Sequence, residues 1–266
     1  MTTAAVLSGA LTLQFPGKSE WKARAQNNDN SSVTGRLPYR QTAGDQERGR
    51  PRKAQIISAR TDCQMKADPR NNHRLFMAIE LTDEARSRFV LVQDELREKL
   101  PPGALRWVRP RNLHLTLHFI GEVDSTTIPL LCEALRAGAG ERRAFELRAR
   151  GTGCFPDHRH PRVIWAGFES SPETNELHRS LARELVSRGF ETEARPYTPH
   201  LTLAHLKKRL PTELSRRIGT RLEELDPGAI VSFPATEISL VESVLTPSGP
   251  VYSRLTAADL RNPADT

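Results

Sequence analysis

The chain has 266 residues, of which 37% are hydrophobic, and it carries a formal net charge of +7. This composition supplies one sizeable core or two small ones, and no apolar run approaches the roughly 18 residues of a membrane span, so the cytoplasm is the expected location. The three cysteines, Cys63, Cys132 and Cys154, form no Cys-x-x-Cys pair, which argues against a disulfide framework or a zinc knuckle.

Most of the positive charge lies near the N-terminus. Residues 1–73 contain 12 Lys or Arg and 6 Asp or Glu, which leaves a net charge of only +1 for the rest of the chain. Because this polar segment shows no sustained helical or strand period, we expect a disordered basic extension over 1–73, a folded domain over 74–258 and a short tail over 259–266. Met65 shortly precedes the first predicted strand, and we hypothesise that the native chain begins there; an intact mass from the native host tests this.

The first half of the folded region predicts a strand, a helix and a second strand. The run RLFMAIEL (74–81) has the length and apolar character of a strand. The stretch 82–100 predicts a helix, since Thr82 precedes two acids and apolar residues recur at helical spacing. After a PPG break, residues 112–122 alternate leucines with polar residues, which is the period of a strand. The polar face of this strand carries His114, Thr116 and His118.

The second half repeats this order. A strand, a helix and a histidine-bearing strand are predicted over 161–169, 171–190 and 197–206. The tetrapeptide His-Leu-Thr-Leu recurs in the last of these, 86 residues after its first occurrence. A helix and strands also follow each copy, at 124–139 and 144–153 after the first, and at 211–225, 233–243 and 250–255 after the second. The chain therefore contains one unit of about 85 residues written twice, and two such lobes bring His114 and His200 to a shared cleft.

Each tetrapeptide places a histidine and a threonine on one face of a strand, about 6.6 Å apart. In-line displacement at phosphorus needs a base on one side and an acid on the other, and histidine serves either role near neutral pH. We therefore interpret His114 and His200 as an acid/base pair, and Thr116 and Thr202 as hydroxyls that hold the nonbridging phosphate oxygens. The two motifs are nearly equivalent, so the residues themselves leave open which histidine is the acid.

Five blocks carry a family resemblance: RLFMAIEL, WVRPRNLHLTLHFIGEV, PRVIWAGFE, RPYTPHLTLAHL and LVESVLTPSGPVYSRL. In this order they resemble the RNA 2',3'-cyclic phosphodiesterases, once called 2'-5' RNA ligases, of the two-histidine (2H) phosphoesterase superfamily, over about 74–258. The resemblance implies a bilobal α+β fold in which two antiparallel sheets line a cleft. It also implies hydrolysis of a 2',3'-cyclic phosphodiester to a 2'-phosphomonoester with no metal or other cofactor, and a minor, reversible 2'-5' ligation.

The same resemblance assigns roles and partners. His114 takes the place of the proton donor to the leaving 3' oxygen, and His200 that of the acceptor that activates water. The implied substrates are RNA with a 2',3'-cyclic phosphate end or a cyclic nucleotide. No membrane partner is implied, and we expect a monomer.

Further candidate residues are Arg162 for phosphate binding, and Tyr197, Phe76 and His118 for the wall of the substrate cleft. His118 stands four residues after His114, but a zinc pair at that spacing needs a helix, and the alternating leucines predict a strand. Simple alternation puts His205 on the face opposite His200, so we expect a structural role for His205. The tract 157–162 predicts a polar loop.

Two other functions stay open on the sequence. The first is a nucleotide-binding module of the same fold with little catalysis; two intact motifs argue against it, because binding alone needs no acid opposite a base. The second is an RNA-binding adaptor that works through the basic extension. Deleting residues 1–64 discriminates, since an adaptor loses RNA affinity while an enzyme keeps its turnover.

Overall fold

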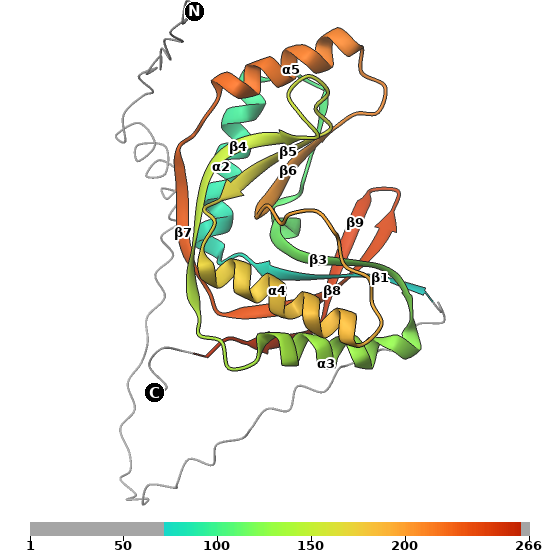
Figure 1. Ribbon diagram of the computed structural model, residues 1–266. Coiled ribbons are helices and arrows are strands. Elements are labelled where there is room, and N and C mark those ends of the chain that lie inside the picture. Colours follow the sequence, from blue (N-terminus) through green and yellow to red (C-terminus); the bar gives the residue numbers. More distant parts are fainter. Residues whose placement is uncertain (1–71, 262–266) are drawn as a thin grey trace, which may run out of the picture. The chain divides into compact units, whose positions relative to one another are not determined.

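The computed structural model describes residues 72–261, which form an α+β fold (Figure 1). The expectations for the basic extension up to residue 71, for a start at Met65 and for the tail from residue 262 lie outside the described residues, as does Cys63. In chain order the elements are β1 (Asn72–Glu80), α2 (Asp83–Lys99), β2 (Leu105–Trp107), the 3-10 helix η1 (Pro110–Asn112), β3 (His114–Asp124), the 3-10 helix η2 (Ser125–Thr127), α3 (Ile128–Ala139), β4 (Phe145–Phe155), β5 (Val163–Phe168), α4 (Pro172–Ser187), β6 (His200–Leu206), α5 (Thr212–Glu224), β7 (Ala229–Ala235), β8 (Glu237–Thr246) and β9 (Gly249–Asp259).

Two antiparallel sheets form the centre of the fold. Their strand orders are β3-β1-β8-β9 and β2-β6-β5-β4-β7, and every neighbouring pair is antiparallel. The predicted α+β fold with two antiparallel sheets is therefore confirmed. The repeat is visible in the order of the elements, since β1, α2 and β3 of the first unit correspond to β5, α4 and β6 of the second. Each histidine-bearing strand pairs with the first strand of its own unit.

The two repeats exchange strands. The last strand of the first unit, β4, pairs with β5 of the second unit, while β8 of the second unit pairs with β1 of the first. Each sheet thus combines segments from both repeats, and neither sheet is a continuous stretch of sequence. The strand predicted over 233–243 is in fact two strands, β7 and β8, interrupted at Thr236, and they belong to different sheets.

The predicted helix start signals are confirmed. At α2 the side chain of Thr82 accepts a hydrogen bond from the backbone N–H of Ala85, which satisfies one of the unpaired donors of the first turn. At α4 the Ser171 hydroxyl accepts in the same way from the backbone N–H of Thr174, and Pro172 occupies the first helical position. Both helices therefore begin where the sequence predicts.

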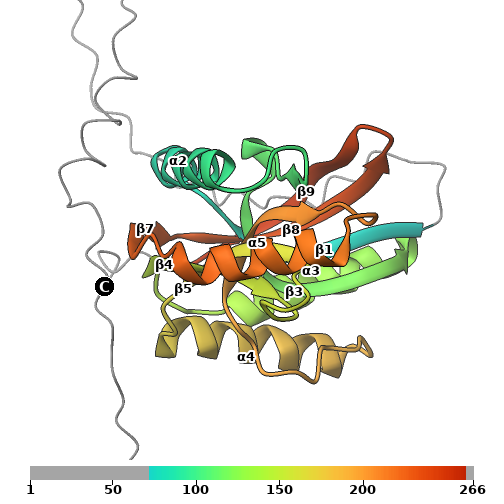
Figure 2. The same ribbon diagram turned by 90° about the horizontal axis from the view of Figure 1, so that it is seen from above.

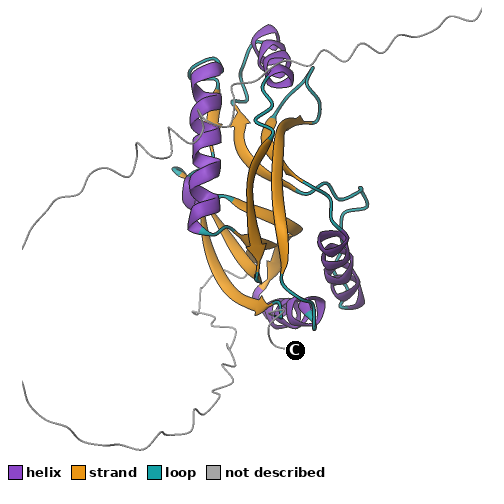
Figure 3. Cartoon of the chain, turned by 90° about the vertical axis from the view of Figure 1, so that its left-hand side faces the viewer, coloured by secondary structure: helices purple, strands orange, loops and turns teal. Residues whose placement is uncertain are grey.

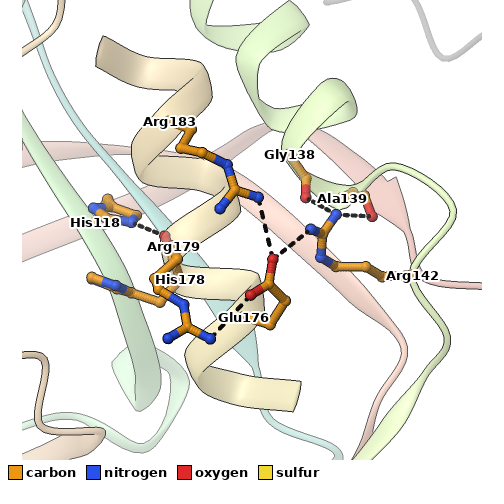
Figure 4. A network of polar contacts seen from close by, with 8 residues as sticks. All are labelled: His118, Gly138, Ala139, Arg142, Glu176, His178, Arg179 and Arg183. Carbon is orange, nitrogen blue, oxygen red and sulfur yellow. Dashed lines mark hydrogen bonds and ion pairs between the residues drawn. The ribbon is translucent and has the colours of Figure 1, made fainter. Parts of the chain in front are cut away.

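The helices lie outside the sheets (Figure 3), and α2 and α4 lie on opposite sides of them when the fold is seen from above (Figure 2). Helices α3 and α4 run side by side (Figure 1), because Gly138 lets α3 approach Leu181 so closely that an added Cβ would lie 2.5 Å from its side chain. Arg142 joins the end of α3 to Glu176 of α4 (Figure 4). No helix among residues 72–261 has the length and apolar character needed to cross a membrane.

A β-bulge interrupts each histidine-bearing strand. The pairing of β3 with β1 skips Leu117, so Leu117 and His118 are consecutive buried residues. The pairing of β6 with β5 skips Leu203, so Leu203 and Ala204 are likewise both buried. One extra residue shifts the alternation of a strand by one. The side chains just beyond each bulge therefore lie on the face opposite the one that simple alternation predicts.

Candidate active site

The two motif histidines open corresponding strands, β3 and β6, and are held in the same way. The Nδ1 atom of His114 lies 2.8 Å from the carbonyl oxygen of Asn112, and that of His200 lies 2.8 Å from the carbonyl oxygen of Thr198. A carbonyl oxygen only accepts, so each Nδ1 carries the hydrogen and donates it. Each Nε2 is therefore the ring nitrogen left to exchange a proton with a ligand.

The pKa of His114 is set by burial and by several groups around it, among them His200. Burial lowers the pKa of His114, and this effect exceeds the opposing ones of the Asn112 carbonyl and of the Glu80 carboxylate, whose strand position is directly opposite. The positive charges of Arg86 and of His200 lower the pKa further. The two imidazoles are therefore within electrostatic range of each other, while the shared cleft stays a prediction.

Aromatic rings hold the imidazole of His114. Phe76 stacks on it with ring centroids 4.7 Å apart, and Tyr252 of β9 meets it edge-on at 5.3 Å. Phe76, Ala78 and Val241 form a small cluster apart from the main core, on the face of β1 and β8 that carries the histidine. Phe76 is only 4% exposed, so it supports His114 and leaves little surface on which a base can stack.

A second aromatic pair surrounds His200. Phe155 of β4 contacts the imidazole edge-on at 4.8 Å, and the ring of Trp165 lies 6.3 Å away. Trp165 is half-buried, and a Cβ at Gly153 of the neighbouring strand would overlap its indole ring. A glycine at position 153 therefore leaves the space that the indole beside His200 occupies.

The threonines lie two residues along from the histidines, on the same faces. Thr116 pairs with Ala78 of β1, and Thr202 pairs with Trp165 of β5. Both side chains are half-buried. Each threonine is separated from its histidine by about 6.6 Å along the strand. At this spacing, a phosphate within reach of the imidazoles would also be within reach of the threonine hydroxyls.

Tyr197 joins the two motifs. Its hydroxyl donates a hydrogen bond to the carbonyl oxygen of Thr116, 3.0 Å away, although the residue itself lies in the loop that leads to His200. Its ring stacks on His178 of α4 at 4.0 Å, and burial raises the pKa of its hydroxyl. Tyr197 therefore ties the loop that precedes β6 to the backbone of β3. Its place in the cleft wall stays a prediction.

The structure does not bring His118 to the histidine pair. The bulge at Leu117 turns His118 to the buried face of β3, where it is 5% exposed. Its Nε2 donates to the carbonyl oxygen of His178, 2.9 Å away, and the two rings stack at 4.1 Å (Figure 4). The expectation that His118 lines the cleft therefore fails, because it assumed an unbroken alternation.

His205 and Arg162 also lie elsewhere than expected. His205 is in register with Val163, which is in register with Phe155, the residue whose ring contacts His200. Side chains directly opposite in antiparallel strands share a face, so His205 lies on the face of His200, and the expectation of the opposite face is wrong. Arg162 is exposed at the start of β5, at the end of the strand pair far from His200.

Three supporting residues escaped the sequence analysis. The amide of Gln93, in α2, is 1% exposed and donates to the carbonyl oxygens of Val108 and Leu203, at 2.9 and 2.8 Å. Arg86 of α2 is half-buried and donates to the carbonyl oxygen of Pro110. Asn112 is buried and donates from its side-chain amide to the carbonyl oxygen of Pro250. A polar residue four positions after Phe89 in the apolar stripe of α2 was the available signal for Gln93.

Side chains suited to metal or covalent chemistry do not gather in this part of the chain. Within residues 72–261, no group of three or more His, Cys, Asp or Glu side chains is placed to hold a metal ion. Cys132 and Cys154 are buried and unbridged, and burial raises the pKa of the Cys154 thiol to about 11. The polar side chains on the motif faces of β3 and β6 described above are two imidazoles and two hydroxyls.

Comparison with known proteins identifies the family. The family model for LigT-like phosphoesterases matches residues 79–165 and 169–252. Two curated relatives are both named RNA 2',3'-cyclic phosphodiesterase. One, from Methanothermobacter thermautotrophicus, is 36% identical over 68% of this chain and 95% of its own length; the other, from Thermotoga maritima, is 32% identical over 68% and 92%.

Solved structures share the fold. The crystal structure of TT0787 of Thermus thermophilus has a TM-score of 0.60 at 30% identity, and the match covers 71% of this chain and 99% of that one. The E. coli LigT structure complexed with 3'-AMP has a TM-score of 0.56 at 28% identity, with 71% and 98% covered. The predicted bilobal architecture therefore has experimental counterparts.

Proposed function

The chain belongs to the LigT-like phosphoesterase family, and from this premise we propose that it hydrolyses the 2',3'-cyclic phosphodiester at RNA ends to a 2'-phosphomonoester. The observation that carries the proposal is the matched pair of imidazoles. His114 and His200 each donate from Nδ1 to a backbone carbonyl and each present a free Nε2. The names of the curated relatives point to the same reaction.

Each imidazole has a defined task in this mechanism. His200 accepts a proton from the attacking water, and His114 gives a proton to the departing 3' oxygen, as the family resemblance assigns. His114 must then be protonated, although burial lowers its pKa in the free protein. A cyclic phosphate carries a negative charge, and its binding beside His114 favours the charged imidazole. The low intrinsic pKa also makes the imidazolium a better acid towards the leaving oxygen.

The threonines complete the proposed site. In the transition state, charge accumulates on the nonbridging oxygens, and hydroxyls fixed on rigid strands stabilise it without reorganisation. Thr116 and Thr202 supply one such hydroxyl from each sheet. A 2'-5' ligation of RNA ends is also part of the proposal, because the 5'-hydroxyl of a second RNA can replace water as the nucleophile: His200 accepts its proton, the bond from phosphorus to the 3' oxygen breaks, and His114 protonates that oxygen. The reverse of the ligation uses the same groups with their protonation states exchanged. No step requires a metal ion.

The test uses a short RNA that ends in a 2',3'-cyclic phosphate, incubated with the purified protein in EDTA. We expect a 2'-phosphate product, and we expect His114→Ala and His200→Ala each to lower turnover by orders of magnitude with little change in thermal stability. Arg179→Ala is the control, because Arg179 is an exposed residue of α4 that lies outside the pair and outside the lining of the basic surface around His160. Near-normal turnover of either variant removes that histidine from the mechanism. An intact cyclic end with the unaltered protein contradicts the proposal and favours the nucleotide-binding alternative.

A further inference from the structure

A strongly basic hollow of about 800 Å³ lies at the end of β6 away from His200. It is lined by residues from β2, the loop before β5, β6 and the segment that follows β6. We call this surface the basic hollow. Its basic side chains are Arg106, Arg159, Arg162, Lys207 and Lys208. All five are exposed, and the lining contains no Asp or Glu.

The basic side chains of the hollow form no ion pair with a carboxylate in the described part of the chain. Elsewhere on residues 72–261 arginines commonly pair with acids, as Arg97 does with Asp94 and Arg216 with Glu213. None of the five side chains of the basic hollow makes such a pair with a described carboxylate. The adjacent Asp157 accepts hydrogen bonds from the backbone N–H groups of Arg159 and His160, and the charge of Arg159 also contributes to lowering its pKa. A concave surface with unpaired positive charge attracts anions.

The basic hollow lies on the same face as the catalytic imidazole. Arg106, His205 and Val163 are opposite one another on three adjacent strands, and the next residue in that row, Phe155, contacts the ring of His200. Their partners on β5, Val163 and Gly167, are four residues apart, so His205 and His200 are separated by about 13 Å along the strands. A ligand longer than one nucleotide can therefore reach from one site to the other across this face.

The position of the cyclic phosphate at the end of an RNA strand determines in which direction the rest of the strand extends. A 2',3'-cyclic phosphate is by definition the 3' end of an RNA, so the remainder of the strand leaves the reacting nucleotide only on its 5' side. We infer that the basic hollow binds backbone phosphates a few nucleotides upstream of the cyclic end, which makes single-stranded RNA the preferred substrate over a cyclic mononucleotide. This inference rests on the proposed function and names its substrate class.

The experiment compares two substrates across two double variants. Cyclic mononucleotide and a tetranucleotide with a 2',3'-cyclic phosphate are hydrolysed by the unaltered protein, by Lys207→Ala with Lys208→Ala, and by Arg179→Ala with Arg183→Ala. The second pair removes the same charge from α4, where both arginines bind Glu176. We expect the lysine variant to lose about tenfold in kcat/KM on the tetranucleotide and nothing on the mononucleotide, while the control changes neither.

Salt dependence and direct binding make the outcome decisive. For single strands each lost phosphate contact lowers the slope of log affinity against log salt by about 0.7, so the lysine variant should lose about 1.4. Fluorescence anisotropy with a 3'-phosphorylated tetranucleotide measures this without turnover. Equal affinity of the lysine variant and the unaltered protein overturns the inference while hydrolysis of the mononucleotide still supports the proposed function. Hydrolysis of neither substrate contradicts the proposed function, and the anisotropy result then decides the inference by itself.

Discussion

His178 lies on α4 between the rings of Tyr197 and His118, and its protonation should destabilise the fold. Burial, with a smaller contribution from the charge of His118, lowers the pKa of His178 to about 4. An unfolded chain has a histidine pKa of about 6.5. Because the pKa is lower in the folded state, the stabilising contribution is complete above the unfolded value and is lost as the pH falls towards 4.

The size of the effect follows from the two pKa values. At about pH 5 the unfolded chain has taken up a proton at this position and the folded chain has not, which lowers the free energy of unfolding by at most about 2 kcal/mol relative to about pH 8. The ring of His178 is only half-buried, so solvent screening reduces the effect, and we expect about 1 kcal/mol.

Urea denaturation at the two pH values measures this loss in the free energy of unfolding. In His178→Phe the ring still stacks on Tyr197 but cannot take up a proton, so the variant should lose about 1 kcal/mol less on acidification than the unaltered protein. His160→Asn removes an exposed histidine and should behave like the unaltered protein. Equal losses for the unaltered protein and His178→Phe would refute the argument that the fold holds this imidazole neutral.

Three further substitutions test the site itself. Tyr197→Phe removes the hydrogen bond to the β3 backbone; we expect about 1 kcal/mol less stability in urea and a severalfold lower kcat, and an unchanged kcat would limit the hydroxyl to a structural role. Glu80→Gln removes a charge that raises the pKa of His114, so the alkaline limb of the kcat/KM profile should move to lower pH; an unmoved limb argues against His114 as the acid. Gly153→Ala should displace the indole of Trp165, which a shift in tryptophan fluorescence and a loss of activity report; an unchanged emission spectrum contradicts the packing described.

The sequence predicted the parts of the fold that depend on local signals. The helix starts at Thr82 and Ser171 follow from side chains that cap the first turn, and the structure confirms both. The order of strands and helices follows from the hydrophobic period and the repeated tetrapeptide. These features need no knowledge of which segments pair across the fold.

The errors come from non-local pairing. A bulge leaves no mark in the alternation of residues, because the skipped position at Leu117 or Leu203 is a leucine like its neighbours. The faces of His118 and His205 were therefore assigned wrongly, each just after a bulge. The roles of Gln93 and Arg86 were missed for a related reason. Each donates to backbone carbonyls that are distant in sequence, and such partners are set by tertiary contact alone.

The exchange of β4 and β8 has a consequence for how such a protein arose and how it can be divided. A single copy of the unit lacks the strand that completes its own sheet, and only a second copy supplies it. A half-length ancestor would thus have been an intertwined homodimer, with its two imidazoles related by a twofold axis. A chain cut between β4 and β5 should yield two fragments that fold only when mixed. In such a dimer the two histidine-bearing strands would belong to different subunits, whereas in this chain the loop between β4 and β5 joins the two units.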